Sequence, residues 1–317
     1  MNVMLFDPHH RIWDFWAVHD KHQYHLYFLQ APRAGHAYIR HDLASIGHAV
    51  SSDLIHWQRR QDALHKGRAG QWDDLSLWTG SVMGYQDKWF MFYTGRDART
   101  RTQNIGLAVS DNLDIWTRFG QSPILYPHSK WYMTGSEETP ESFTWRDPFV
   151  VYDPHSQLFY LLIACHDRSR PLGYQGAIGY AVSEDLYHWT LMPPLLSPGW
   201  FQHLEVPTII WWEDAWYLFV SVKAEWFHPS SPFGRPITGT LCFRSQNITG
   251  PFVVVKPPIV VEKWYALRPV NLGTQWGLLG WRMGEEEGYP QHPFPYGVDN
   301  PKGLIQTANH TLQIINL

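Results

Sequence analysis

One short segment recurs along this chain, and its repetition constrains the fold more than any local pattern does. Three copies are clear, at residues 46–57, 105–116 and 178–189, and a weaker copy covers residues 241–252. Each clear copy begins with alternating apolar and polar residues, passes through a Ser/Asp turn and reaches a Trp. This order predicts a strand, a turn and the start of another strand. The segment is therefore a hairpin of a repeating β unit.

Two more strands precede the hairpin in each unit. One is rich in aromatic residues, and a fifth copy of it indicates a fifth unit. These aromatic strands are expected at residues 24–29, 88–93, 158–163, 215–220 and 276–281. A further strand is expected ahead of each of them, at residues 13–16, 78–81, 145–148, 204–207 and 267–270.

The period of the repeat predicts the fold. Asp14, Gly80, Asp147, Glu205 and Arg268 stand at matching places in the first strands, at steps of 66, 67, 58 and 63 residues. Four strands per unit in five units is the arrangement of a five-bladed β-propeller, an all-β fold whose radial repetition leaves only short edges. We expect one domain over residues 1–317, with blades at roughly 10–65, 76–125, 143–198, 202–258 and 264–317. The tail after Lys302 is expected to supply the outer strands of the last blade.

Composition excludes several classes of partner. The chain has 317 residues, 44% of them hydrophobic, and a net charge of -4, so it offers no field that attracts nucleic acid or an anionic membrane. The N-terminus has no basic start followed by an apolar run, which leads us to expect a cytoplasmic protein. Only two cysteines occur, Cys165 and Cys242, and we expect both to be buried free thiols.

Acidic residues stand at matching places in three of the first strands. Asp14, Asp147 and Glu205 should point toward the propeller axis, where strands from different blades converge. Three carboxylates among Trp side chains match the needs of glycosidic cleavage: a nucleophile or base, a protonated acid, and negative charge for an oxocarbenium-like transition state. This chemistry needs no cofactor. The Trp side chains expected near these three carboxylates are Trp13, Trp16, Trp78 and Trp145.

Other polar residues fit these roles less well. Asp7 lies too far ahead of its aromatic strand to replace Asp14, and Asp73 and Asp74 fall in a loop. Three acids near the motif strands stay open as residues that reach substrate: Asp97, Glu141 and Glu225. The chain has 18 histidines, but those near the N-terminus lack ligand spacing on one element, so we expect no metal site.

With these motifs in place, the chain resembles the five-bladed fructan-active glycoside hydrolases, the invertase and levansucrase clan of families 32 and 68, which is related to family 43. Residues 12–16, Ile-Trp-Asp-Phe-Trp, resemble the levansucrase nucleophile segment Val-Trp-Asp-Ser-Trp. Residues 78–81, Trp-Thr-Gly-Ser, are similar to Trp-Ser-Gly-Ser, and Arg146-Asp147-Pro148 matches the Arg-Asp-Pro of the transition-state stabiliser. Residues 205–207, Glu-Val-Pro, resemble the acid/base segment.

The resemblance implies roles for individual residues. Asp14 would be the nucleophile, Asp147 would bind the fructosyl hydroxyls and Glu205 would be the acid/base. The substrate-binding residues would be Trp13, Trp16, Trp78, Thr79, Ser81, Arg146 and Arg268. Two departures stand out: the chain ends at the fifth blade, so we expect no C-terminal β-sandwich of the invertase kind, and His203-Leu204 replace the acids that precede the levansucrase acid/base.

The expected function is therefore retaining hydrolysis of β-fructofuranosides such as sucrose or short fructo-oligosaccharides, with a carbohydrate as the partner and oligomeric state open. Two alternatives remain. One is an inverting arabinofuranosidase- or xylosidase-type propeller, in which Asp14 activates water instead of attacking the sugar. The other is a non-catalytic carbohydrate-binding propeller, which would need the Trp residues but not the three acids.

Overall fold

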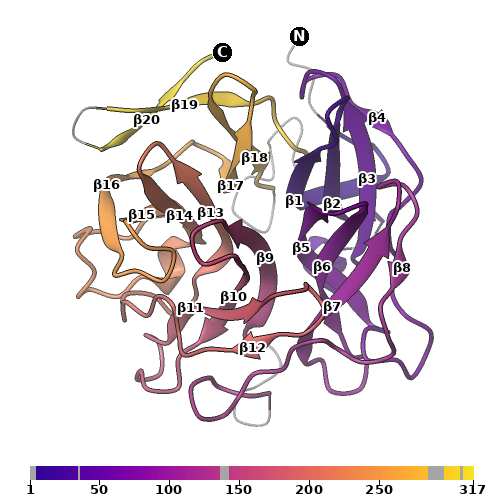
Figure 1. The fold of residues 1–317 in the computed structure, drawn as a ribbon, viewed down its shortest axis with the longest axis horizontal. Helices are drawn as coiled ribbons and strands as arrows, with labels where there is room; N and C mark the ends of the chain where they lie inside the picture. The colour runs from indigo at the N-terminus through magenta and orange to yellow at the C-terminus, as the bar shows by residue number, and fades with distance from the viewer. Residues whose placement is uncertain (1–4, 35, 136–142, 285–295, 308–309) are drawn as a thin grey trace.

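The repeat folds into five four-stranded antiparallel sheets arranged around a central axis (Figure 1). The computed structural model describes residues 5–34, 36–135, 143–284, 296–307 and 310–317. Each sheet is built from four strands that follow one another in the chain, so each repeat forms one blade. The predicted all-β, five-bladed propeller is confirmed. Within the described residues, no helix is long and apolar enough to cross a membrane.

The blades share one strand order, from the axis outward. The first has β1 (His10–His19), β2 (Tyr24–Pro32), β3 (Ser45–Ser51) and β4 (Gln58–Arg59). The second has β5 (Ser76–Tyr85), β6 (Lys88–Arg96), β7 (Gln103–Ser110) and β8 (Thr117–Arg118), and the third has β9 (Trp145–Asp153), β10 (Leu158–His166), β11 (Gly176–Ser183) and β12 (Thr190–Leu191). The fourth has β13 (Glu205–Trp212), β14 (Ala215–Val222), β15 (Gly239–Ser245) and β16 (Val253–Ile259). The fifth has β17 (Trp264–Asn271), β18 (Trp276–Arg282), β19 (Lys302–Gln306) and β20 (Leu312–Ile315).

The inner strands close a ring. Contacts join β1 to β5, β5 to β9, β9 to β13, β13 to β17 and β17 back to β1. The N-terminal segment seals the junction, because Leu5 forms an isolated bridge with Val298 and the Ile12 amide donates to the Tyr296 carbonyl at 3.0 Å. The last blade takes its two outer strands from the tail after residue 301, as the sequence predicts. Two short 3-10 helices, η1 (Ala37–His41) and η2 (Ala224–Trp226), lie in the connections.

The recurring Ser/Asp segment is a tight turn with a leucine in the left-handed region. In the first blade, Asp53 Oδ1 accepts from the amides of Ile55 and His56 at 2.9 and 2.8 Å, and Leu54 has φ 63°. The second and third blades repeat this geometry at Leu113 (φ 66°) and Leu186 (φ 68°). A left-handed leucine costs free energy. Capping of the turn amides and full burial of the leucine offset that cost.

Every inner strand carries a β-bulge near its start. The strand register shifts around Asp14 in β1, Thr79 in β5, Asp147 in β9, Val206 in β13 and Ala266 in β17. Four of these five residues have a positive φ, between 22° and 58°. Bulges re-aim side chains and recur next to active sites.

The bulges correct the alignment of the repeats expected from the sequence. Asp14 and Asp147 are equivalent, as predicted. In the other three inner strands the equivalent residue differs from the one expected. It is Thr79 and not Gly80 in β5, Val206 and not Glu205 in β13, and Ala266 and not Arg268 in β17. Glu205 therefore lies one residue before its bulge, whereas Arg268 lies two residues after its own.

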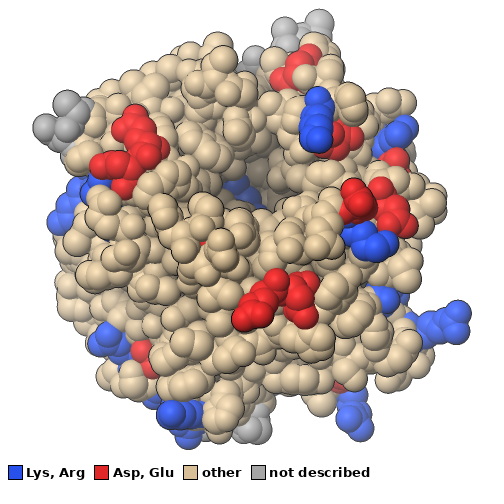
Figure 2. Space-filling model, viewed as in Figure 1, with Lys and Arg blue, Asp and Glu red and all other residues tan. Residues whose placement is uncertain are grey.

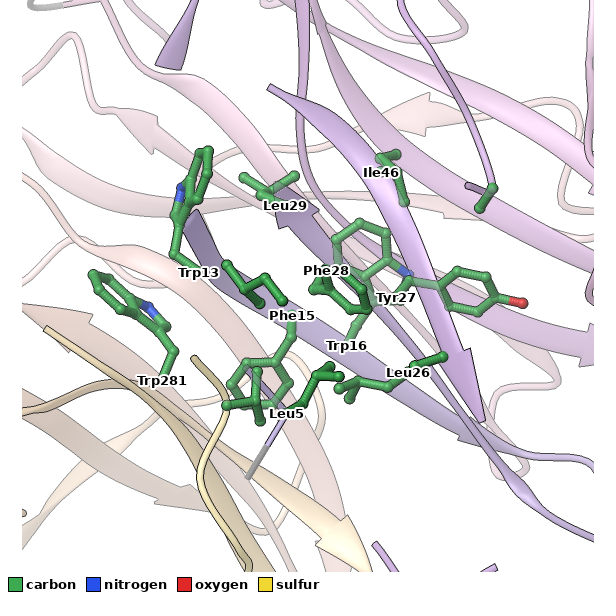
Figure 3. Packing of buried hydrophobic residues seen from close by; sticks show 14 of the residues in the cluster. Leu5, Trp13, Phe15, Trp16, Leu26, Tyr27, Phe28, Leu29, Ile46 and Trp281 are labelled. Carbon is green, nitrogen blue, oxygen red and sulfur yellow. The ribbon is translucent and has the colours of Figure 1, made fainter. Parts of the chain in front are cut away.

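Apolar side chains fill the spaces between blades. Figure 3 shows Trp16 beside Tyr27 and Phe28 in the core of the first blade, while Trp13 lies beside Trp281 of β18. The rings of Trp16 and Tyr27 stack with centroids 6.1 Å apart. Cys165 and Cys242 are buried free thiols, as predicted, and burial raises the pKa of both.

Gly80 follows the bulge in β5 and packs against backbone. A Cβ built there would lie 2.2 Å from the Phe92 carbonyl oxygen, closer than van der Waals contact permits. We expect Gly80→Ala to lower the free energy of unfolding by about 1–3 kcal/mol, because the neighbouring strand must shift to admit the methyl group. Urea unfolding measures this, with Gly70→Ala at an open turn as the matched control: Gly70 has φ +87° and no neighbour near its Cβ, so it reports backbone strain alone. A smaller loss at Gly80 than at Gly70 would contradict the packing argument.

Candidate active site

A cavity of about 510 Å³ opens at one end of the propeller axis. The face drawn in Figure 2 is hollowed near its centre, and blue Lys or Arg atoms are visible inside that hollow. All five inner strands contribute side chains to the cavity of about 510 Å³, and η1, β2, β6, β7, β18 and the connecting loops supply the rest of its wall.

The bulges explain which residues reach the cavity. The residue before each bulge lines it: Trp13, Trp78, Arg146, Glu205 and Tyr265. The bulged residue itself also lines it in three blades, at Asp14, Thr79 and Asp147. In the other two blades the bulged residue is apolar, Val206 or Ala266, and does not reach the cavity. The kink at the start of the inner strand thus presents two consecutive side chains to one end of the axis in three blades and one side chain in the other two.

Asp14 is held by two neutral donors from other blades. Thr79 Oγ1 donates to Asp14 Oδ2 at 2.9 Å, and Trp281 Nε1 donates to Asp14 Oδ1 at 2.9 Å. Burial raises the pKa of the Asp14 carboxyl, and the charge of Glu205 raises it further. The Thr79 hydrogen bond and the cations Arg268 and Arg40 oppose this rise in pKa. The hydrogen bonds from Thr79 and Trp281 fix the Asp14 carboxylate in a single orientation in the cavity.

Glu205 has cationic and phenolic partners. Arg146 Nη2 donates to Glu205 Oε1 at 2.8 Å, and the Tyr265 hydroxyl donates to Glu205 Oε2 at 2.9 Å. Arg146 is itself positioned by Thr144, whose Oγ1 accepts from Nη1 at 3.0 Å. The Glu205 side chain retains 17% of its accessible surface, whereas Asp147 retains 3% of its own. Glu205 is therefore the more open of these two acids.

Asp147 is buried in the same cavity as the other two acids, and their charges act on it. Its Oδ2 accepts from the Val206 amide at 3.0 Å, and its own amide donates to Thr94 Oγ1 at 2.9 Å. Burial raises the pKa of Asp147 to about 7; Arg146 opposes the rise, while Glu205 and Asp14 add to it. Desolvation and the neighbouring negative charges therefore favour the protonated form of Asp147, so that its protonated and ionised forms are both populated near neutral pH.

One side of the cavity combines aromatic rings with arginines. The Arg96 guanidinium lies 4.3 Å from the centroid of the Trp78 ring, and Arg40 lies 5.2 Å from that of Trp13. Trp78 Nε1 donates to the His41 carbonyl at 2.8 Å. Burial lowers the pKa of His41 well below its usual value, and the surrounding cations lower it further, so His41 is neutral at neutral pH.

The structure brings most of the predicted site residues together and leaves three apart. Asp14, Asp147 and Glu205 share the cavity with Trp13, Trp78, Thr79 and Arg146. Trp16 packs in the core, and Ser81 accepts from the Val150 amide at 3.0 Å. Trp16, Ser81 and Arg268 instead border a second cavity, of about 220 Å³, formed by the later parts of the inner strands. These three side chains do not reach the cavity that holds the acids.

Several cavity residues were not identified from the sequence. They are Leu29, Ile39, Arg40, His41, Asp42, Arg96, Arg101, Gln103, Lys223, Tyr265 and Trp281. Tyr265 stands at the repeat position before the bulge, and correct placement of the fifth bulge would have identified it. Leu29 and Trp281 lie in aromatic strands expected from the repeat, where each pairs with the residue before the bulge of its own blade.

The remaining acidic candidates have local structural partners. Asp7 accepts from the amides of His9 and His10, and Asp73 accepts from the Tyr93 hydroxyl. Asp97 caps its own turn, with Oδ1 2.7 Å from the Thr100 amide, and Glu225 lies in η2 outside the cavity lining. Glu141 lies outside the described residues.

Within the parts of the chain that the structure describes, His, Cys, Asp and Glu side chains form no group of three or more that could hold a metal ion. The cavity thus offers carboxyls, a neutral imidazole, hydroxyls and guanidinium groups. Such a set can bind sugar hydroxyls, attack or hydrate an anomeric carbon, and protonate a leaving oxygen.

Known proteins are similar to this chain in sequence. The family model described as "Glycosyl hydrolases family 32 N-terminal domain" matches residues 17–224. A fructan 1-exohydrolase from Bromus pictus is 28% identical over 194 residues, which cover 59% of this chain and 28% of that protein. A sucrose-6-phosphate hydrolase from Bacillus subtilis is 26% identical over 190 residues, which cover 58% of this chain and 34% of that protein. The matched region is thus about a third or less of the length of these curated relatives.

Solved structures share the fold at low identity. An inulosucrase from Halalkalicoccus jeotgali bound to kestose superimposes with a TM-score of 0.78 and 19% identity, over 100% of this chain and 92% of that chain. The levansucrase of Bacillus subtilis gives a TM-score of 0.76 and 14% identity, over 97% of this chain and 86% of that one. At identities this low, these structures show that the propeller fold is shared and nothing further.

Proposed function

The chain belongs to glycosyl hydrolase family 32, and from this premise we propose that it hydrolyses β-fructofuranosides with retention of anomeric configuration. One observation carries the proposal: Asp14, Asp147 and Glu205 come from three different blades and line a single cavity. A carbohydrate-binding propeller without catalysis has no use for three mutually repelling carboxyls. Their desolvation and repulsion cost stability, which is typical of catalytic groups.

Asp14 is the nucleophile in this proposal. The two hydrogen bonds from Thr79 and Trp281 fix its carboxylate and stabilise its charge, so that one oxygen lone pair faces the anomeric carbon. Attack forms a covalent bond between an Asp14 oxygen and the anomeric carbon while the bond to the leaving oxygen breaks. Water then attacks the same carbon and releases Asp14.

Glu205 is the acid and then the base. It delivers its proton to the leaving oxygen in the first step and accepts a proton from the attacking water in the second. Its greater exposure relative to Asp147 suits a group that meets both the leaving sugar and incoming water. Arg146 and Tyr265 hold its two oxygens in place and stabilise the carboxylate formed after proton transfer.

Asp147 binds the hydroxyls of the fructosyl ring. Its fixed position, set by the Val206 amide, lets it accept from vicinal hydroxyl groups. Charge that develops on the ring in the transition state then strengthens these hydrogen bonds. The faces of Trp13 and Trp78 supply the apolar contact that sugar rings favour.

A phosphorylated fructoside is a second candidate substrate, and the charge of the cavity favours it. Five cations, Arg40, Arg96, Arg101, Arg146 and Lys223, face four acids, Asp14, Asp42, Asp147 and Glu205. Arg96 and Arg101 share the single acid Asp42, and Lys223 forms no ion pair within the described part of the chain. A phosphate monoester would balance this surplus. The activity named for the Bacillus subtilis relative agrees with this charge pattern.

NMR-followed hydrolysis tests both candidates. The purified protein is incubated with sucrose, sucrose 6-phosphate, inulin, levan and an aryl arabinofuranoside, and the first anomer released is recorded. We expect β-fructofuranose before mutarotation, and a higher kcat/KM for the phosphorylated disaccharide if the second candidate is right. An α-anomer as the first product would favour the inverting alternative. No fructose from any substrate would refute the fructosidase proposal, and a protein carrying Asp14→Asn serves as the control for contaminating activity.

A further inference from the structure

Arg268 does not line the cavity that holds the three acids; it borders the second cavity. It follows the bulge in β17 by two residues, so its side chain leaves the strand toward the second cavity. The residue is 4% exposed. Even so, its charge acts on both Asp14 and Asp147. Arg268 therefore sits between the floor of the acid-bearing cavity and the other end of the axis.

The hydrogen bonds of Arg268 are incomplete. Nη1 donates to the Gly80 carbonyl at 3.3 Å, while Nε and Nη2 are buried and have no hydrogen-bond partner. A buried guanidinium with unmet donors lowers stability, since desolvation is not recovered by hydrogen bonding. Burial correspondingly lowers the pKa of Arg268 to about 10, with Asp14 and Asp147 opposing the fall. The group remains a cation at neutral pH.

Packing does not account for this residue, because an apolar side chain of similar length would fill the site without the cost of desolvation. What an apolar side chain cannot supply is positive charge. Asp14 receives negative potential from Glu205 and positive potential from Arg40 and Arg268. Asp147 receives negative potential from Glu205 and Asp14 and positive potential from Arg146. Among these cations, Arg40 and Arg146 line the substrate cavity and Arg268 does not.

We propose that Arg268 is a positioning residue whose positive charge keeps the Asp14 carboxyl ionised. It acts from outside the substrate cavity, where bound substrate does not displace it. The Gly80 contact places the guanidinium beside the Trp-Thr-Gly-Ser strand, whose Thr79 also donates to Asp14. Substrate binding removes water from the cavity and thereby raises the cost of a charged nucleophile. A cation outside the substrate cavity lowers that cost in every step of the reaction. The inference rests on the proposed role of Asp14 as nucleophile.

The direct test measures carboxyl pKa values without substrate. Protein labelled with ¹³C at the Asp side chains is titrated by NMR, and Asp14→Asn and Asp147→Asn assign the two resonances. We expect Arg268→Met to raise the apparent pKa of the Asp14 carboxyl by about one unit or more, and Arg268→Lys to restore most of the difference. Unchanged carboxyl pKa values in folded Arg268→Met would overturn the proposal. This outcome is independent of whether the protein hydrolyses fructosides.

A kinetic test connects the charge to turnover. Removing the cation raises the pKa of the nucleophile, so the acidic limb of the kcat/KM profile of Arg268→Met should move to higher pH by about one unit. Activity should then fall about tenfold on the acidic side and stay near that of the unmodified protein on the basic side. Arg11→Met removes another buried arginine from an inner strand and is the matched control. An equal loss at every pH, or the same shift in Arg11→Met, would indicate a structural role and refute the inference.

Discussion

Asp14→Asn should lower kcat for fructoside hydrolysis by about 10⁴- to 10⁶-fold, the size of loss seen when a covalent nucleophile is removed from an enzyme that uses one. The amide cannot form the bond to the anomeric carbon, and nothing else in the cavity occupies its position between Thr79 and Trp281. The KM should change far less than kcat, since Asp147 and the Trp faces still bind the sugar. Initial rates with sucrose measure this.

The substitution is nearly isosteric but disturbs one hydrogen bond. Asp14 accepts from Thr79 and from Trp281, whereas an asparagine offers one accepting oxygen and one donating nitrogen. We therefore expect a loss of about 1–3 kcal/mol in unfolding free energy, which leaves the fold intact. Thr79→Val is the matched control, because it removes one of these bonds and keeps the carboxylate. If Asp14→Asn retained more than about one hundredth of kcat while Thr79→Val lost more, Asp14 would not be the nucleophile.

The sequence was sufficient for the propeller because the repeat is carried by strong local signals. The Ser/Asp turn recurs at residues 51–56, 110–115 and 183–188, and in each copy it fixes the direction of the chain before a short outer strand. The strands on either side of it then pair only with strands of the same unit. A repeated local pattern therefore indicates the strand order of every blade.

Motifs that span a bulge led to side chains that line the cavity with the acids, and residues beyond the bulge line the second cavity. Asp14 and Asp147 are bulged residues. Trp13 and Arg146 belong to the same two motifs and stand directly before the bulges, so they were predicted together with the acids. In the fifth blade the Arg-Pro pair at residues 268–269 resembled the Asp-Pro pair of the third, but the bulge lies two residues earlier. A shift of two residues keeps the face of the strand but moves a side chain roughly 7 Å along it. Arg268 therefore borders the second cavity instead of the cavity that holds the acids.

The other residues that were missed come from outside the inner strands. Trp281 stands at the end of β18 and reaches Asp14 across the ring closure, a contact between residues 267 positions apart. Arg40 and Lys223 lie in connections, where no period constrains position. Only the closed ring brings these segments together at the end of the axis, so the repeat alone does not show that they line one cavity.

Glu205→Gln should lower kcat for sucrose by about 10²- to 10⁴-fold, the usual contribution of a general acid. Glutamine can still accept from Arg146 through its oxygen and donate to the Tyr265 hydroxyl oxygen through its nitrogen, so the fold should survive, but it cannot act as a general acid. A nitrophenyl β-fructofuranoside needs little protonation of its leaving oxygen, and its first step should be much less affected. The covalent fructosyl group should then accumulate on Asp14, because the second step lacks its base, and mass spectrometry of the Asp14 peptide detects it.

The competing assignment gives the proton to Asp147, whose pKa is raised to about 7 in the substrate-free protein, while Glu205 is paired with Arg146. The two assignments differ in a measurable way. If Glu205 is the acid, Glu205→Gln removes the basic limb of the kcat/KM profile and Asp147→Asn keeps it while weakening both kcat and sugar binding. If Asp147 is the acid, the pattern reverses and the nitrophenyl substrate rescues Asp147→Asn. We expect the first pattern, because a sugar that hydrogen-bonds to Asp147 through its hydroxyls stabilises the ionised form of that carboxyl, and Glu205 is the more open of the two acids toward the leaving oxygen.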